Sequence, residues 1–440
     1  MDCVILQDNE MNMKKTFILT ICLLATWFTM TAQVARQQIH ENIDLAASNY
    51  LAYPGPKYQL TPAPEGYEPY YISHYGRHGS RYLIGTADYD RPYFALLHAD
   101  SLGKLTIKGK ETLAEVRLIR EEAKGRDGEL TPLGAQQHRE IAQRMMARFP
   151  EVFNGETNIN ARSTIVIRCI LSMSNALQEM VRNNQQLHIT HDASYHDMFY
   201  MNDQNSSYNK LRDTPEAKSA LKNFNKAHTD YNHLAGVLFN DPDYSRQLDL
   251  NDFGTRLLHL SSNVQSTELR HQLSLWDLFT EDEVYNYWLC NNAYWYMYFG
   301  PSRQTNSAGI YTQANLLRNI IATADTCLQL PHPGATLRYA HESDVMPFVC
   351  LLDLNNYGQT IDNLEDLDAC GWHNYDIYPM GCNVQFIFYK PISGSLKDAD
   401  ILVKVLLNED EASLPIATDS APYYHWSDVR AYYLNKIKDK

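Results

Sequence analysis

The spacing of apolar and polar residues along the chain predicts strands and helices that alternate near both ends. Short apolar runs predict five strands, at 70–75, 159–162, 335–340, 384–389 and 401–407. Apolar residues at helical spacing predict five helices, at 108–124, 131–148, 165–181, 343–352 and 426–437. This alternation predicts an α/β fold in which a central, mainly parallel sheet is flanked by helices.

The middle of the chain follows a different pattern. Residues 185–325 are polar, Asn-rich and aromatic, with helical spacing over 211–227 and 282–299. We therefore predict a mainly helical cap at 185–325, inserted into an α/β core made of 33–184 plus 326–440. The Tyr and Trp residues within this cap are interpreted as helix packing rather than as a ligand-binding surface.

Residues 1–32 are typical of a secretory signal peptide. Two lysines precede the apolar stretch 16–30, and small residues follow that stretch. The acidic residues before Met13 do not suit such a segment, so we expect translation to start at Met13 or at Met11. The pattern predicts a secreted or periplasmic protein without a stable membrane anchor, and an uncleaved N-terminal anchor is the alternative.

The composition narrows the range of partners. The 440 residues are 44% hydrophobic and 20% charged, and the formal net charge is −14. Such an acidic surface argues against nucleic acid and anionic membranes as partners, but a local basic pocket still suits a small anionic substrate. The cysteines show no spacing typical of a metal site, and Cys370 and Cys382 are candidates either for a disulfide or for free thiols.

Three segments share one arrangement, in which basic residues follow a predicted strand and precede a predicted helix. They contain Arg77, His78 and Arg81, then Arg162, and finally His341. Ligands of open parallel sheets bind at the carboxyl ends of the strands, where helix N-termini favour phosphate. The sequence therefore predicts that these five side chains converge on one anion.

The residues Arg77-His78-Gly79-Ser80-Arg81 and the later His341-Glu342 resemble the histidine acid phosphatases, the branch of the histidine phosphatase superfamily that includes phytases. Further similarity lies in 128–131 with Gly134 and Gln137, and in 162–164 with Arg168 six positions beyond Arg162. The segments 383–387 and 405–409 are similar to multiple inositol polyphosphate phosphatases.

This resemblance implies a mechanism. His78 attacks phosphorus and becomes a transient phosphohistidine, while Arg77, Arg81, Arg162 and His341 hold the phosphate oxygens. A carboxylic acid then protonates the leaving oxygen. The resemblance implies neither a metal nor an organic cofactor, because the arginines supply the positive charge.

The identity of the proton donor is less direct. Most members of the family carry His-Asp at the second histidine, and the inositol polyphosphate branch carries His-Ala-Glu, whereas this chain has His341-Glu342-Ser343-Asp344. Glu342 occupies the Asp position with one extra methylene, so we expect Glu342 to be the donor. Asp344 is the alternative, although it suits the first turn of the predicted helix equally well.

The substrate is expected to be a phosphate ester. Lys210 and Arg212 lie in a stretch that resembles inositol polyphosphate phosphatases, and Arg303 is a further candidate cation, although all three also suit ordinary solvated positions. We predict hydrolysis of inositol phosphates, phytate included. A broad-specificity acid phosphatase or sugar-phosphatase is the alternative, and a non-catalytic phosphate-ester binding protein is a third interpretation. The oligomeric state is not predicted.

Overall fold

The computed structural model describes residues 34–393 and 401–440, so the predicted signal peptide lies outside the described residues. Its sheet has the strand order β3-β2-β4-β1-β5-β6-β7, and β8 pairs with β6. The strands are β1 (Tyr67–Arg77), β2 (Thr157–Ser163), β3 (Leu187–Asp192), β4 (Gly334–Ala340), β5 (Asn383–Pro391), β6 (Leu402–Leu407), β7 (Asp410–Ala412) and β8 (Tyr424–His425).

The sheet has a parallel half and an antiparallel half. The pairs β2–β3, β2–β4 and β4–β1 are parallel, whereas β5, β6, β7 and β8 pair in antiparallel fashion. β1 lies where the halves meet, and its last nine residues are buried, as expected for an aromatic and β-branched central strand. The predicted α/β class is confirmed, and its parallel strands end in the predicted basic segments.

The longer helices are α2 (Val34–Glu41), α3 (Thr86–Ser101), α4 (Ile107–Ala123), α5 (Pro132–Arg148), α7 (Ile167–Asn183), α10 (Pro215–His228), α13 (Leu250–Val264), α14 (Glu281–Phe299), α16 (Ala314–Cys327), α17 (Glu342–Leu352) and α19 (Trp426–Lys436). The shorter ones are η1 (Ile43–Tyr50), α6 (Pro150–Phe153), η2 (Tyr195–Asp197), α8 (Met198–Met201), α9 (Ser207–Leu211), α11 (Asn232–Leu238), α12 (Pro242–Ser245), α15 (Ala308–Tyr311) and α18 (Asn374–Ile377). Short 3₁₀ turns occur at η3 (Glu268–His271), η4 (Trp276–Leu278), η5 (Arg303–Thr305), η6 (Leu354–Asn356) and η7 (Leu364–Asp366).

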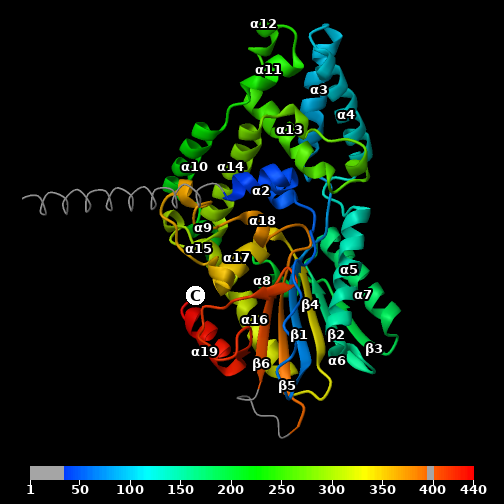
Figure 1. Ribbon diagram of the computed structural model, residues 1–440, viewed down its shortest axis with the longest axis vertical. Coiled ribbons are helices and arrows are strands. Elements are labelled where there is room, and N and C mark those ends of the chain that lie inside the picture. The colour runs from blue at the N-terminus through cyan, green and yellow to red at the C-terminus, as the bar shows by residue number, and fades with distance from the viewer. Residues whose placement is uncertain (1–33, 394–400) are drawn as a thin grey trace, which may run out of the picture.

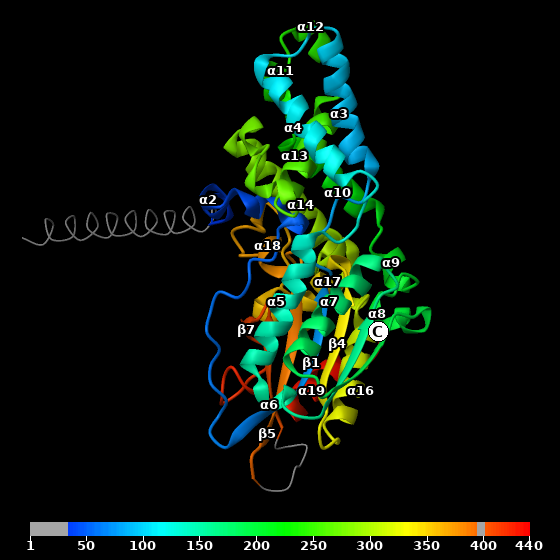
Figure 2. The same ribbon diagram turned by 90° about the vertical axis from the view of Figure 1, so that its right-hand side faces the viewer.

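These helices cover both faces of the sheet and extend beyond one end of it. α5, α6 and α7 lie on one face, and α8, α16, α17 and α19 lie on the other (Figure 1, Figure 2). α3, α4, α11, α12 and α13 form a separate helical group past the carboxyl ends of the parallel strands (Figure 1). The site described below lies between this group and the sheet.

The helical group differs in detail from the predicted cap at 185–325. α3 and α4 precede that range, yet α3 packs on α13 and α4 packs on α11. Conversely, β3 lies inside the range but is a strand of the sheet, and α16 packs on β1. Helix α3 was not predicted from the sequence, because Pro92 interrupts the helical pattern and the apolar residues form no clear stripe.

A local capping side chain fixes the start of α5, whereas no side chain caps the start of α17. α5 begins as its sequence indicates, with the Thr131 side chain accepting a hydrogen bond from the Gly134 N–H and Pro132 in the first turn. For α17 the pattern predicted a helix from residue 343, but the helix starts at Glu342 and His341 is its N-cap. This shift of one residue places both His341 and Glu342 at the start of the helix, beside the strand ends.

Two predictions about cysteines and membranes can be compared with the described residues. Cys370 is exposed and Cys382 is buried, and both are free thiols, so the candidate disulfide is not formed. Within 34–393 and 401–440, no helix combines the length and the apolar character needed to span a bilayer.

The loop after β1 is packed directly against the start of α5. The Ser80 carbonyl accepts hydrogen bonds from the Thr131 N–H at 2.9 Å and the Thr131 hydroxyl at 3.1 Å, while Gln137 exchanges hydrogen bonds with Ser80. At Gly79 and Gly134 the two backbones touch, so that a Cβ on either residue overlaps with the other segment. These contacts explain why 128–131, Gly134 and Gln137 accompany the motif at 77–81.

Replacing Gly79 or Gly134 with alanine is therefore expected to lower the free energy of unfolding by about 2 kcal/mol or more, because backbone atoms cannot move aside as flexible side chains do. Urea denaturation measures this change. Gly236→Ala is the matched control, since nothing lies within 4 Å of a Cβ built there. Equal stability of the Gly79→Ala, Gly236→Ala and unsubstituted proteins would contradict the packing argument.

Candidate active site

The carboxyl ends of three parallel strands meet at one place. In the sheet register Arg77 of β1 lies opposite Ala340 of β4, and Ser163 of β2 lies opposite Tyr339. The chain leaves β1 held by its neighbours, because the His78 N–H donates to the Ala340 carbonyl at 3.0 Å. The His78 carbonyl in turn accepts from the Gly381 N–H at 2.9 Å. These bonds place His78 directly beside His341 and Glu342.

The protonation of His78 follows from its surroundings. Its Nδ1 lies 2.9 Å from the Gly79 carbonyl oxygen, and a carbonyl only accepts, so Nδ1 carries the proton. Nε2 therefore keeps its lone pair. Burial lowers the pKa of His78 well below its usual value, although the contact with Glu342 acts in the opposite direction. The ring therefore stays neutral. A neutral, oriented imidazole is what a nucleophile requires.

The Glu342 carboxylate lies in the middle of this group. Its Oε2 accepts a hydrogen bond from Arg77 Nε at 3.0 Å and lies 3.5 Å from His78 Nε2. Its Oε1 lies 3.6 Å from a terminal nitrogen of Arg81. Burial raises the pKa of Glu342, but the positive charges of Arg77 and Arg81 outweigh burial and hold it well below its usual value.

Three guanidinium groups surround this carboxylate with part of their hydrogen-bonding capacity unused. Arg77 donates from one terminal nitrogen to the Tyr378 carbonyl, and Arg81 donates to the Tyr82 carbonyl. The other terminal nitrogen of Arg77, and the Nε atoms of Arg81 and Arg168, are buried without a hydrogen-bond partner. Buried donors of this kind are costly unless a ligand satisfies them, and oxyanions are the ligands that match guanidinium groups.

His341 lies opposite His78, with ring centroids 5.6 Å apart. Arg168 lies 3.4 Å from its Nδ1, and Thr164 Oγ1 lies 3.2 Å from its Nε2. Because a guanidinium only donates, Nδ1 accepts from Arg168 and Nε2–H donates to Thr164. His341 is thus a neutral ring that accepts a hydrogen bond from Arg168 and helps to fix its position.

The structure brings Arg168, rather than Arg162, into the cluster. Side chains alternate along β2, and Arg162 faces away from its buried neighbours Ala161 and Ser163, pairing with Asp197 at 3.3 Å. Arg168 lies in the first turn of α7, and the charges of Arg77 and Arg81 contribute to its lowered pKa after burial, the largest cause. Arg162 therefore does not lie in the cluster where it was expected, and Arg168 lies there instead; its position six residues beyond Arg162 was the signal in the sequence.

Asp344 lies outside the group that touches His78. It is buried in the first turn of α17, and one of its carboxylate oxygens has no hydrogen-bond partner. Burial, followed by the negative charge of Glu342, raises the pKa of Asp344 well above its usual value. Of the two candidate donors, Glu342 is the one in contact with the histidine and the arginines.

The three cap cations have different surroundings. Arg212 is half-buried over the ring of Phe299 at 4.2 Å, and its charge acts on Asp344. Lys210 is exposed on α9. Arg303 is paired with Asp362 at 2.8 Å on the surface, an arrangement that argues against its expected role in binding substrate. Only Arg212 is placed beside the start of α17.

One residue near the cluster was not anticipated from the sequence. The guanidinium of Arg81 lies 5.4 Å from the ring centroid of Tyr50, which ends η1. Burial raises the pKa of Tyr50, and the charges of Arg81 and Glu342 act on it with opposite signs. Tyr50 closes the 3₁₀ helix η1, an element that was not predicted from the sequence.

His78, His341 and Glu342 each offer a ligand atom within 4.8 Å of the others, which is the spacing of a metal-binding group. Three neighbouring guanidinium groups oppose a divalent cation at this point, because each carries a permanent positive charge. The donor set therefore fits an anion better than a metal ion.

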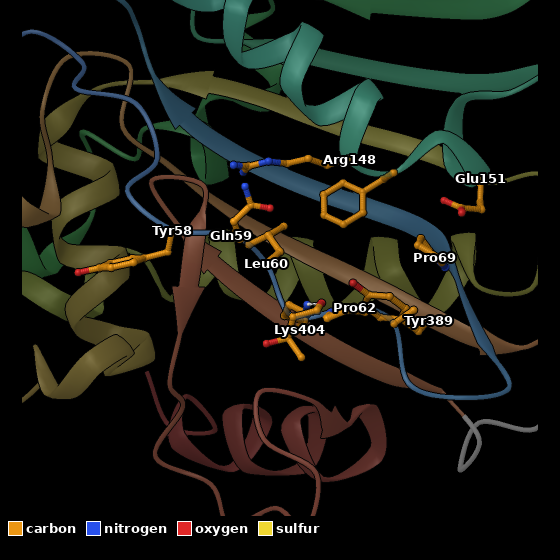
Figure 3. A pocket seen from close by; sticks show the side chains of 12 residues that line it. Tyr58, Gln59, Leu60, Pro62, Pro69, Arg148, Glu151, Tyr389 and Lys404 are labelled. Atoms are coloured by element: carbon orange, nitrogen blue, oxygen red, sulfur yellow. Dashed lines mark hydrogen bonds between the residues drawn. The ribbon is translucent and has the colours of Figure 1, made fainter.

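A cavity of about 380 Å³ lies at the opposite end of the sheet (Figure 3). Its lining includes Pro69 of β1, eight residues before Arg77, which is about 26 Å along an extended strand. The cations at its wall are engaged: Lys404 donates to the Thr61 carbonyl and to Glu411, and Arg148 donates to the Glu409 carbonyl. This cavity is separate from the arginine cluster.

Comparisons with known proteins agree with this geometry. Residues 76–408 match the family model for the histidine phosphatase superfamily (branch 2). No curated protein sequence matches the chain.

Solved structures are similar in fold. The multiple inositol polyphosphate phosphatase of Bifidobacterium longum, in complex with inositol hexasulfate, is 18% identical with a TM-score of 0.72, covering 88% of this chain and 97% of that chain. The phytase from D. castellii is 14% identical with a TM-score of 0.64, covering 90% and 86%. Hafnia alvei phytase is 13% identical with a TM-score of 0.51, covering 85% and 98%.

The two arginines are distinguished by a matched pair of variants. Arg168→Ala is expected to lower kcat/KM for phosphate-ester hydrolysis by about 100-fold or more, because it removes a buried donor from the anion position. Arg162→Ala, which breaks an ion pair with Asp197 instead, should have a much smaller effect. Steady-state kinetics with a chromogenic phosphate ester measures both, and a larger effect of Arg162→Ala would contradict the assignment.

The buried histidines predict loss of stability in acid. Burial lowers the pKa of His74 to about 3, of His138 to about 4 and of His341 to about 3. Because the unfolded chain binds protons with pKa values near 6.5, their contribution is complete above that pH and is lost as the pH falls toward 4. Each neutral histidine should change the free energy of unfolding by up to about 1.4 kcal/mol per pH unit.

Urea denaturation between about pH 7 and pH 4 measures this slope. His138→Gln should reduce it, whereas His188→Gln, at a largely exposed position, should leave it unchanged. Equal slopes for His138→Gln and the unsubstituted protein would show that His138 is protonated in the folded state.

Proposed function

Because the chain belongs to the histidine phosphatase superfamily (branch 2) and is a phosphomonoester hydrolase, we propose that it hydrolyses inositol phosphates, phytate included, through a phosphohistidine intermediate. One observation carries this proposal. Three guanidinium groups, each with a buried donor that has no partner, and a neutral histidine with a free Nε2 surround one point at the strand ends.

In the first step, His78 Nε2 attacks phosphorus in line with the leaving oxygen. The N–P bond forms as the P–O bond breaks, and Arg77, Arg81 and Arg168 neutralise the charge that develops on the phosphoryl oxygens. Glu342, in its protonated form, gives its proton to the departing alkoxide, which prevents the release of a strongly basic anion.

In the second step, the ionised Glu342 takes a proton from water, whose oxygen attacks phosphorus and displaces His78. The products are inorganic phosphate and the original imidazole, so the protein returns to its starting state. Glu342 lies among His78, Arg77 and Arg81, whereas Asp344 lies outside this group, and this placement supports Glu342 rather than Asp344 as the donor and base once substrate is bound.

The choice of substrate rests on the similar structures and on the cap. Solved structures similar in fold are phytases and an inositol polyphosphate phosphatase in complex with inositol hexasulfate. Arg212 and Lys210 lie on the segment that leads into α10, and we propose that they contact phosphate groups that are not being hydrolysed. The positive cluster inside an acidic protein favours anionic small molecules over anionic polymers.

We also propose that the protein acts after export, as a secreted or periplasmic enzyme. Residues 1–32 carry the charge, apolar stretch and small residues that export signals share.

The decisive experiment measures phosphate release from phytate by the purified chain from Gln33 onward, with EDTA present. Release should continue in EDTA, because the arginines supply the positive charge. His78→Ala should abolish turnover, and His188→Ala, at an exposed histidine, is its control. Glu342→Gln should lose turnover by about 100-fold or more, whereas Asp344→Asn should retain a larger share.

Other outcomes redirect the assignment. Hydrolysis of simple esters such as glucose-1-phosphate, without hydrolysis of phytate, would indicate a broad acid phosphatase or sugar-phosphatase. Tight binding of phytate without release of phosphate would indicate a phosphate-ester binding protein. Activity retained in His78→Ala would refute the phosphohistidine mechanism.

A further inference from the structure

The Glu342 carboxylate lies at the centre of the arginine cluster rather than at its edge. It spans the groups that are suited to a phosphate, with contacts of 3.0 Å to Arg77, 3.5 Å to His78 Nε2 and 3.6 Å to Arg81. Carboxylate and phosphate present oxygen pairs of similar geometry to a guanidinium group. The carboxylate therefore stands where the oxygens of a bound phosphate belong.

This position is incompatible with donating a proton. As long as the arginines hold it, the pKa of Glu342 stays well below its usual value, because their charges outweigh the effect of burial. The carboxylate also lies in front of His78 Nε2, the atom that must approach phosphorus. A productive complex thus requires Glu342 both to move and to gain a proton.

Among the groups that face Glu342, only the arginines carry positive charge, so a change in their contacts is what allows Glu342 to gain a proton. They are Arg77, His78 and Arg81 after β1, Arg168 and Cys169 of α7, His341 and Asp344 around the start of α17, Tyr50 of η1, and Tyr378 and Cys382 of the segment before β5. Burial keeps the histidines and Asp344 neutral and raises the thiol and phenol pKa values. Only the arginines carry positive charge, and only Glu342 carries negative charge.

We infer that Glu342 is a resident anion that holds the phosphate position in the free protein, and that the phosphate group of the substrate displaces it and thereby loads it with a proton from solvent. This inference rests on the proposed function. Binding of the substrate and protonation of the general acid then occur together.

The protons and charges balance in this exchange. The arriving phosphate takes over the hydrogen bond from Arg77 and the ionic contact with Arg81, and satisfies the unpartnered donors of all three arginines. Glu342 then faces an anion instead of cations, a change that favours the neutral carboxyl group, and one proton moves to it from water. Release of inorganic phosphate reverses the exchange, because the carboxylate competes for the same arginines.

Proton uptake upon ligand binding tests this directly. Inositol hexasulfate is the probe, because its sulfate groups stay ionised and it cannot supply or take the proton itself. Isothermal titration calorimetry at about pH 5.5, between the ordinary pKa values of Glu and His, is carried out in buffers with different ionisation enthalpies. We expect uptake that approaches one proton per protein.

Two variants assign the proton. Glu342→Gln should bind inositol hexasulfate at least about tenfold more tightly than the unsubstituted protein, since no resident anion must be displaced, and should take up no proton. Asp344→Asn should retain the uptake, because Asp344 is already neutral before binding.

Absence of uptake in the unsubstituted protein would overturn the inference without reference to any variant. Uptake that persists in Glu342→Gln, or that disappears in Asp344→Asn, would overturn it as well. Hydrolysis of phytate, measured on the same preparations, separates the two proposals. Hydrolysis without uptake overturns this inference alone, whereas uptake without hydrolysis counts against the proposed function alone.

Discussion

Positive charge buried at the end of a sheet is the constraint on which the rest of this structure depends. Arg77 and Arg81 are almost completely buried, and a third guanidinium, that of Arg168, lies beside them. Such groups remain charged at any accessible pH, so the fold must either pair them or offer them to an anionic ligand. Glu342 pairs with them only in part. Carbonyl groups accept from Arg77 and Arg81, and a neutral His341 accepts from Arg168, so that the arginines are held in place while some of their donors stay unpaired.

Several features of this arrangement were accessible from the sequence because they depend on local chemistry. β1 was predictable since its aromatic and β-branched run has no competing helical pattern. The start of α5 was predictable from Thr131 and Pro132, whose side chains fix a helix N-terminus irrespective of tertiary structure. The convergence of 77–81 with His341 followed from the rule that ligands bind at carboxyl strand ends.

The features that the sequence did not provide depend on packing between distant segments. Whether Arg162 or Arg168 reaches the anion depends on which face of β2 is turned to α7, and a difference of one residue in register reverses it. Tyr50 reaches Arg81 only because η1 packs against α13, α14 and α18, contacts that no local pattern encodes. The start of α17 shifted from Ser343 because His341 is fixed by Thr164 and Arg168 rather than by a capping side chain.

The backbone hydrogen bonds around His78 also determine at what stage of folding its surroundings can form. Its N–H and carbonyl are bound by Ala340 and Gly381, and the Arg77 N–H by the Cys382 carbonyl, all more than 260 residues further along the chain. A growing chain therefore exposes this histidine long before its supports exist. Closing loops of that length is slow, so folding should be limited by the arrival of the last third of the chain. Until then the proposed nucleophile lacks its supports, and the candidate active site forms only when the C-terminal strands add to β1.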